Sequence, residues 1–235
     1  MLPKIRADFD EDDVYFYQAF KPSFADFSVA NQRFGGDDFK PARMTWIKPS
    51  FAWVLYRSGY AMKHNQERIL KVNLSHEVVF SILAACNCPE GGADSTHPPT
   101  PITSSASASR GVVQWDPARD LNCFDSKNKK VPRKMFRERA IQIGLGGGLS
   151  DFYVNNTLSI EDLTKKAREV GRAHGEKNEK DCEEAVQAMF EAGRLQIEKE
   201  YEPEFLQDAH KLRLGLLPGE AADRIAQLGR GGVKT

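Results

Sequence analysis

The sequence predicts an α+β protein: a single domain with a small β-sheet core, flanking helices and a helical C-terminal part. Its 235 residues are 40% hydrophobic, which is enough to build one sizeable core. Segments rich in β-branched and aromatic residues, which favour strands, lie before residue 146, and the longest helical patterns come after it. This order favours an α+β fold over a doubly wound sheet, in which strands and helices alternate.

The first strand-like and helix-like segments follow one another closely. Residues 14–20 (VYFYQAF) predict a strand, and Pro22 suits the first turn of the short helix that follows. Residues 69–74 (ILKVNL) predict a second strand. Ser75 can cap the next helix (HEVVFSILAAC), because its side-chain oxygen can accept a hydrogen bond from a free amide of the first turn.

The middle of the chain returns to strands before helical patterns take over. Residues 112–115 (VVQW) predict a strand that turns at Asp116-Pro117, and residues 139–145 (RAIQIGL) predict another that ends in three glycines. A helix is expected over residues 159–170, with Ser159 as its cap. A further helical pattern covers residues 182–200.

Two segments differ in composition from the rest. Pro89 to Gly111 consists mostly of Pro, Ser, Thr, Gly and Ala, with almost no large apolar residue. Such a segment cannot offset the entropy of ordering, so we expect a disordered insertion over residues 89–111. Residues 203–235 carry charge and glycine around a lone apolar stripe, and we expect a helical extension beyond a core domain of residues 1–202.

Composition and cysteine spacing exclude several classes of protein. The 33 basic and 33 acidic residues balance, so the net charge gives no bulk attraction to nucleic acid or anionic membranes. The chain has no apolar run of about 18 residues and begins without an apolar signal segment, which predicts a cytoplasmic protein with reduced cysteines. Four cysteines and five scattered histidines lack the paired spacing of metal ligands, so no metal is expected.

The segment of residues 43–60 (RMTWIKPSFAWVLYRSGY) is the strongest candidate for a functional surface. A proline and a glycine bound a predicted helix within it. Ser50 would lie in the first turn, where free backbone amides attract anions, with Arg43 and Lys48 upstream and Arg57 in the helix. Together these groups can hold a phosphate, and the nearby aromatic rings can stack on a base or a nicotinamide ring.

Several of these residue types also have a purely structural interpretation. An aromatic helix is more often part of a core than of a ligand site, which favours core positions for Phe51 and Trp53. Gln18 and Gln142 lie in strand-like runs, where a buried amide either braces the backbone or contacts a ligand. Glu67, near a strand end, can act as a base, hold a ribose hydroxyl or simply be a surface charge.

Five stretches together carry a resemblance to a known family. IRADFDEDDVYFYQAF, RMTWIKPSFAWVLYRSGYA, QERILKVNL, VVQWDPARDL and RAIQIGL closely resemble domain-of-unknown-function family 4291, from about Ile5 to Tyr201. The family has no established activity that can be carried over. It is in turn similar to the ADP-ribosyltransferase-like fold, in which a small split β-sheet core grips NAD. That fold uses an aromatic strand, an Arg or His near the ribose, and a late catalytic Glu.

The resemblance implies a split or mixed sheet that binds a nucleotide or dinucleotide, with NAD as the cofactor of a transferase or of a degenerate relative. Where the late catalytic glutamate is expected, this chain has Gln142. The expected site comprises Arg43, Lys48, Ser50 and Arg57 for phosphates, Tyr17 and Trp46 for ring stacking, Gln18 for ribose or amide contacts, and Glu67 and Gln142 as catalytic candidates.

Two other classes of function stay open. A non-catalytic module for single-stranded nucleic acid would use the same aromatic and basic groups. A structural or adaptor protein would instead use the late helices as its interface. Turnover of NAD, salt-sensitive binding of oligonucleotides, or neither would distinguish the three classes.

Overall fold

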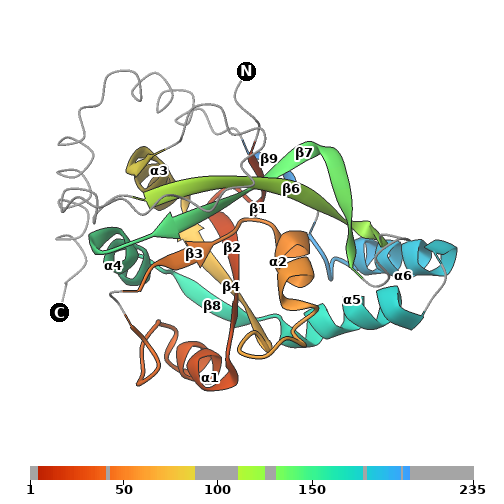
Figure 1. The fold of residues 1–235 in the computed structure, drawn as a ribbon, viewed down its shortest axis with the longest axis horizontal. Coiled ribbons are helices and arrows are strands. Elements are labelled where there is room, and N and C mark those ends of the chain that lie inside the picture. Colours follow the sequence, from red (N-terminus) through yellow and green to blue (C-terminus); the bar gives the residue numbers. More distant parts are fainter. Residues whose placement is uncertain are drawn as a thin grey trace.

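The computed structural model has the α+β architecture of a single domain, built around two β-sheets (Figure 1). It describes residues 5–40, 43–87, 111–124, 131–176, 179–196 and 198–201. These residues hold nine strands and six helices. The predicted fold class is therefore confirmed.

The larger sheet has five strands in the order β8-β4-β2-β1-β9, and every neighbouring pair is antiparallel. Its strands are β1 (Ile5–Phe9), β2 (Asp13–Phe20), β4 (Arg68–Ser75), β8 (Ser159–Asp162) and β9 (Lys199–Tyr201). β2 and β4, which the sequence predicted, pair along their full length at the centre.

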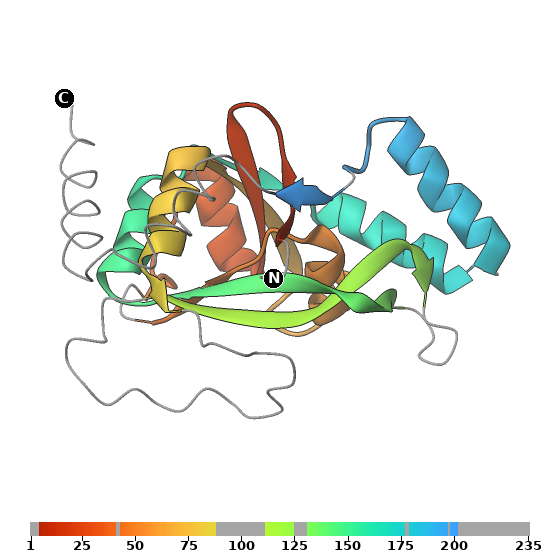
Figure 2. The same cartoon turned by 90° about the horizontal axis from the view of Figure 1, so that it is seen from above.

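The smaller sheet has four strands in the order β3-β7-β6-β5. They are β3 (Thr45–Ile47), β5 (Cys86–Asn87), β6 (Gly111–Phe124) and β7 (Pro132–Leu145). β6 and β7 form a long antiparallel ribbon, which runs along one side of the molecule in Figure 2. The sheet is mixed, because β5 joins β6 in parallel.

Helices pack on both sides of the larger sheet and enclose two hydrophobic cores. They are α1 (Pro22–Asn31), α2 (Phe51–Ser58), α3 (His76–Ala84), α4 (Gly148–Asn155), α5 (Thr164–Glu176) and α6 (Glu179–Glu191). The first core lies between the two sheets and is closed by α1, α3 and α4. The second lies between the other face of the larger sheet and α2, α5 and α6, and α5 and α6 lie together at one end of the molecule (Figures 1 and 2).

The Ser75 cap of α3 and the end of α2 at Gly59 are confirmed, but α2 begins at Phe51, two residues after the predicted start at Pro49. Ser75 caps α3, since its side chain accepts from the amide of Val78. Ser50 caps α2, since its Oγ accepts from the amide of Trp53 at 3.2 Å. α2 ends at Gly59, whose φ of 58° lies in the left-handed region that favours glycine.

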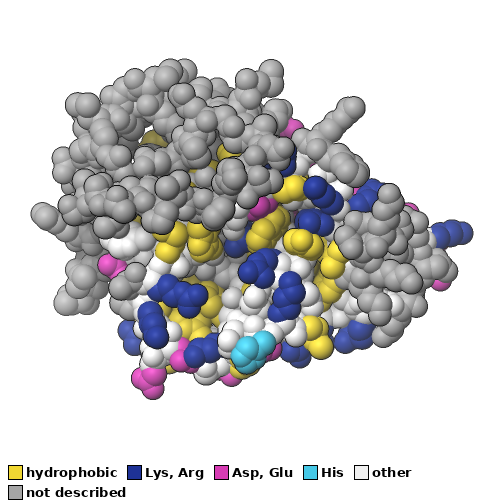
Figure 3. Space-filling model, in the orientation of Figure 1, with side chains coloured by type: hydrophobic (Ala, Val, Ile, Leu, Met, Phe, Trp, Pro, Cys, Tyr) yellow, Lys and Arg dark blue, Asp and Glu magenta, His cyan; other side chains and the backbone are white. Residues whose placement is uncertain are grey.

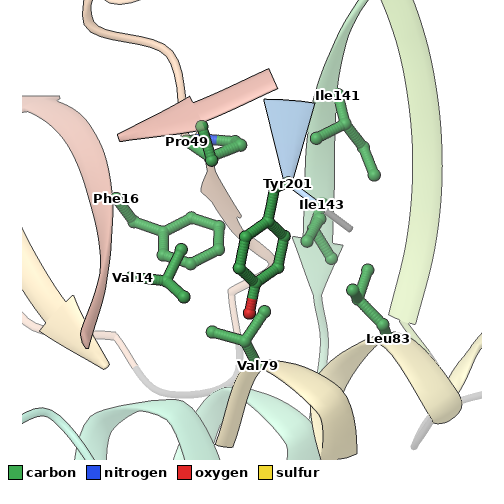
Figure 4. Close-up of a pocket in the computed structure, with 9 residues that line it drawn as sticks. Val14, Phe16, Pro49, Val79, Leu83, Ile141, Ile143 and Tyr201 are labelled. Atoms are coloured by element: carbon green, nitrogen blue, oxygen red, sulfur yellow. The ribbon is translucent and has the colours of Figure 1, made fainter. Parts of the chain in front are cut away.

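The larger sheet splits beside β2, and this split positions the candidate site. β1 pairs with β2 only near the turn that joins them. Farther along, the segment that leads into α2 lies beside β2 instead, and the Tyr17 amide donates to the Lys48 carbonyl at 2.7 Å. Pro49 then lies between Phe16 of the larger sheet and Ile143 of the smaller one (Figure 4). These residues line an apolar cavity of about 10 Å³, which is a packing gap rather than a ligand site.

The predicted turn at Asp116-Pro117 is wrong, because β6 continues through it to Phe124. Proline lacks the N–H that the strand ladder needs, and the register with β7 shifts just after it, between Pro117 and Arg119. The neighbouring strand β7 is also longer than the predicted residues 139–145. β6 and β7 pair with each other on both sides of Pro117, and this pairing continues both strands past the local turn signal.

The late part of the chain is mostly helical, as predicted, but its element boundaries differ from the predicted ones. Residues 159–162 form β8 against β4, so Ser159 does not cap a helix. α5 begins at Thr164 instead, whose amide donates to Asp162 Oδ1 at 2.9 Å. The pattern over residues 182–200 is divided between α6 and β9. Pairing with the larger sheet satisfies these backbone groups in a way that local helical periodicity could not anticipate.

The two segments of unusual composition fall mainly outside the described residues. The C-terminal extension, residues 203–235, lies there entirely, as does the insertion except for Gly111. Gly111 is the buried first residue of β6. A Cβ at this position would lie 2.3 Å from Cys86 Sγ, so the close approach of β6 to β5 requires glycine.

Candidate functional site

A pocket of about 270 Å³ opens beside the N-terminus of α2. β1, the start of α2, the β6–β7 ribbon, α6 and the segment before β9 form its wall. Its lining combines apolar side chains with polar and charged ones: Ala52, Leu121, Met135 and Phe190 with Arg6, Arg119, Asp120, Gln187, Gln196 and Glu198. Such a lining suits a small polar ligand with an apolar part.

Glu198 is anchored to the start of α2 by two hydrogen bonds. Its Oε1 accepts from Ser50 Oγ at 3.0 Å and from the Ala52 amide at 3.2 Å. The carboxyl group therefore occupies the position at the helix N-terminus where the sequence analysis expected a phosphate. Two hydrogen-bond donors at this helix start are thus used by a carboxyl group of the chain itself.

The surroundings of Glu198 favour its protonated form. Burial raises the pKa of Glu198 to about 7, and the nearby Asp8 carboxylate adds to the effect. The two hydrogen bonds and the Arg6 guanidinium act in the opposite direction but do not cancel it. Arg6 itself pairs with Glu138 and donates to the Glu198 carbonyl at 3.0 Å, so its charge is largely compensated.

Asp8 belongs to a buried polar group next to Glu198. Only 4% of Asp8 is exposed, its Oδ2 accepts from the Tyr17 hydroxyl at 2.5 Å, and Lys71 Nζ lies 3.7 Å away. Burial and the Asp8 charge hold the pKa of Tyr17 well above its ordinary value. Tyr17 is thus a buried donor beneath the pocket, in contact with Phe51, and not an exposed stacking platform.

Arg119 is the lining cation with the least charge compensation. Its guanidinium lies 3.5 Å from the centroid of the Tyr56 ring and donates to the Pro132 carbonyl at 3.3 Å. Its Nε is buried without a hydrogen-bond partner. Within the described part of the chain, no carboxylate forms an ion pair with Arg119, whereas the neighbouring Asp120 pairs with Arg133.

A second group of polar residues lies on the outer face of the smaller sheet. Ile47, Val113 and Ile143 point into the first core, so the alternate residues Lys48, Gln114 and Gln142 lie on the opposite face. Asp116 shares this face and accepts from Gln114 Nε2 at 3.3 Å through Oδ1. Figure 3 shows Lys and Arg side chains interspersed with hydrophobic ones on the face of the molecule that includes β3 and α2.

The residues predicted to hold phosphate are only partly brought together. Lys48 Nζ lies 4.7 Å from the centroid of the Trp53 ring, and the charge of Arg57 contributes to lowering the pKa of Lys48, so Lys48 lies beside α2, which carries Arg57 in its last turn. Ser50 faces Glu198 instead. Arg43 is exposed in the loop before β3.

The other predicted residues lie apart from the pocket. Gln18 is 5% exposed, and it braces the core by donating to the Trp46 carbonyl at 3.0 Å and accepting from the Tyr153 hydroxyl at 2.6 Å. The structural alternative for Gln18 is therefore the one that the geometry fits. Trp46 packs across Gly144 on the outer face of the smaller sheet. Glu67 Oε1 accepts from the Asn65 amide in the loop before β4.

The profile of a protein family described as Domain of unknown function (DUF4291) matches residues 4–201. The chain belongs to this family. No curated protein and no solved structure matches the chain. The comparisons thus support the predicted DUF4291 membership and give no support to a similarity with the ADP-ribosyltransferase-like fold.

The DUF4291 match spans both ends of the pocket lining, from Arg6 to Glu198. Sequence reasoning missed both residues and Arg119. The alternation of Arg6 and Asp8 in the strand IRADF was the available signal for Arg6, but nothing local distinguishes Glu198 from the other late glutamates.

None of the described helices is long and apolar enough to cross a membrane. Within the described ranges, no three His, Cys, Asp or Glu residues are grouped to hold a metal.

Proposed function

We propose that this DUF4291 protein is a nucleotide-binding enzyme in which Glu198 carries out acid–base or electrostatic chemistry on a ribose-containing substrate, with NAD as the first candidate. The observation that carries the proposal is the Glu198 carboxyl group, which lies in the wall of a pocket with a pKa raised to about 7. A group with such a pKa populates both protonation states near neutral pH, which is the property required of a general acid or base.

The geometry around Glu198 supports this role. Both of its hydrogen bonds use Oε1, so Oε2 remains for a ligand. Ser50 and the first amides of α2 fix the carboxyl group on a rigid element, which limits the reorganisation that catalysis would otherwise require. The resemblance implied a late catalytic glutamate, but the expected position holds Gln142. In this proposal Glu198 takes the role of that glutamate.

The rest of the pocket suits a phosphorylated ribose compound. Arg119 can pair with a phosphate, because no described carboxylate forms an ion pair with it. Gln187 and Gln196 can bond ribose hydroxyls, and Phe190 offers an aromatic surface. A volume of about 270 Å³ is at the lower limit of ligand pockets, so it would hold one half of a dinucleotide while the other half extends outward.

With NAD as substrate, the reaction would be transfer of the ADP-ribosyl group. The bond between the ribose carbon and nicotinamide breaks, and nicotinamide leaves as a neutral molecule with the electron pair. An acceptor or water forms the new bond to the same carbon and releases one proton to the solvent. Positive charge develops on the ribose as the old bond breaks. A Glu198 carboxylate beside it would stabilise that charge.

Ligand binding and turnover test the proposal together. Thermal unfolding should be measured with NAD, ADP-ribose, ATP and a short oligonucleotide, because a ligand at a hundred times its Kd stabilises the native state by about 2.7 kcal/mol. NAD turnover should fall at least a hundred-fold in Glu198→Gln, and binding about ten-fold in Arg119→Ala. Glu161→Gln, a change at an exposed glutamate of β8, serves as the matched control.

Two results would overturn this function. One is a Glu198→Gln variant that turns over NAD as fast as the native chain. The other is stabilisation by none of the nucleotides. Salt-sensitive stabilisation by the oligonucleotide alone would instead favour the non-catalytic nucleic-acid-binding class.

A further inference from the structure

We propose that Lys48 is an amine nucleophile that condenses reversibly with the aldehyde of a small phosphorylated aldose, while Asp116 transfers the protons. This second site lies on the outer face of the smaller sheet, its residues are not among those that line the Glu198 pocket, and it does not rest on the function proposed for Glu198. Its elements are the end of β3, the outer face of α2 and the middle of β6.

The side chain of Lys48 is partly buried beside α2. Its backbone is fixed by the hydrogen bond from Tyr17, and its Nζ rests over the Trp53 ring. Among the described residues, no carboxylate forms an ion pair with it. Burial lowers the pKa of Lys48 to about 8; Asp116 opposes the shift and Arg57 adds to it. At pH 7 about a tenth of the amine is then neutral and able to attack a carbonyl carbon.

Asp116 is the neighbouring group that can transfer a proton. Gln114 orients it through Oδ1, and Oδ2 is buried without a hydrogen-bond partner. Burial raises the pKa of Asp116, although the charges of Lys48, Arg139 and Arg119 and the bond from Gln114 oppose the rise. A buried carboxylate oxygen without a partner is costly in a folded protein, which is a reason to expect that it has a partner during function.

The reaction balances without any added oxidant or reductant. The neutral amine of Lys48 forms a C–N bond to the aldehyde carbon, and a proton passes from nitrogen to the carbonyl oxygen, giving a carbinolamine. Protonated Asp116 then gives its proton to the hydroxyl group, which leaves as water. The iminium ion returns a proton from nitrogen to Asp116. One amine and one aldehyde thus give one imine and one water molecule.

The surrounding side chains define the class of ligand. Arg57 is exposed, its charge acts on Lys48, and no described carboxylate forms an ion pair with it, so a phosphate on the ligand can pair there. The Trp53 face gives the carbon chain of a sugar an apolar surface. Gln142 lies on the same face and can bond a hydroxyl group. These groups match an open-chain aldose phosphate such as ribose 5-phosphate.

Reductive trapping tests the site with the full chain. The protein is incubated with ribose 5-phosphate and sodium cyanoborohydride at pH 7, and modified lysines are mapped by peptide mass spectrometry. We expect Lys48 to be labelled at least ten-fold faster than exposed lysines such as Lys180, and more than five-fold faster than with ribose. Asp116→Asn should slow labelling of Lys48 about ten-fold while leaving Lys180 unchanged.

The labelling pattern of the native chain decides the question even if a variant fails to fold. Equal labelling of Lys48 and Lys180 overturns the proposal. Labelling of Lys48 by ribose as fast as by ribose 5-phosphate overturns the assigned ligand class. An unchanged Lys48 rate in folded Asp116→Asn overturns the role of Asp116.

Discussion

Replacing Glu198 with glutamine should remove a specific pH dependence of stability. The folded-state pKa of Glu198 is raised from 4.5 to about 7, so the folded chain keeps this proton where the unfolded chain has lost it. The contribution to stability is therefore fully present below pH 4.5 and is lost as the pH rises through about 7. Each pKa unit corresponds to about 1.36 kcal/mol, which sets an upper limit of about 3 kcal/mol.

The measurement is the free energy of unfolding of both proteins by urea at several pH values between 4.5 and 8. Glutamine keeps an oxygen that can accept the bonds from Ser50 and Ala52, so the helix cap survives in the variant. Subtracting the free energy of unfolding of the variant from that of the native protein cancels the contributions of the other titrating groups. The difference should fall by up to about 3 kcal/mol across this range.

If the native protein and Glu198→Gln differ in free energy of unfolding by a constant amount between pH 4.5 and 8, or by an amount that rises with pH, the pKa of Glu198 is not raised. A rise would mean that the helix N-terminus and Arg6 outweigh burial and lower the pKa of Glu198. A titration of the Glu198 carboxyl carbon by NMR gives an independent midpoint, which we expect near pH 7.

Three further comparisons test hydrogen bonds and packing elsewhere in the fold. Ser50→Ala should lower the free energy of unfolding by about 1–2 kcal/mol, more than Ser75→Ala, because Ser50 also donates to a carboxylate; urea unfolding compares the two. Gln18→Leu should cost about 1–3 kcal/mol by leaving the Tyr153 hydroxyl unpaired, and Tyr153→Phe added to it should restore part of the loss of Tm. Gly171→Ala should lower Tm although alanine favours helices, since its Cβ would lie 2.7 Å from a tyrosine side chain; an unchanged or raised Tm would contradict this clash.

The elements that the sequence predicted correctly are those specified by short-range rules. The strand at residues 14–20, the cap at Ser75 and the end of α2 at Gly59 each depend on hydrogen bonds or conformations within a few residues. The predicted turn at Asp116-Pro117 failed for the opposite reason. Its outcome depends on pairing with β7, which no local signal contains.

For the candidate site, too, the sequence indicated local features but not the contacts between distant segments. The segment 43–60 contributes Lys48, Ser50 and Trp53 to the two proposed sites, although the sequence favoured a core position for Trp53. It could not indicate that a carboxyl group of the same chain would lie at the start of α2. Ser50 and Glu198 are 148 positions apart in sequence, and Arg6 contacts the Glu198 carbonyl across 192 positions.

The sequence by itself determined the α+β class, the central strands, the capped helices and membership of the DUF4291 family. All of these depend on composition, periodicity and motifs that are readable along the chain. Only the tertiary structure decided that β1 pairs with β2 over a short stretch, and that β9 pairs with β1 at the edge of the sheet. It also decided that Ser50 donates a hydrogen bond to Glu198 beside a pocket. The physical reason is that strand pairing and burial bring together segments that are distant in sequence. The raised pKa of Glu198 is an example, because it results from burial and from the nearby charge of Asp8, which exist only in the folded chain.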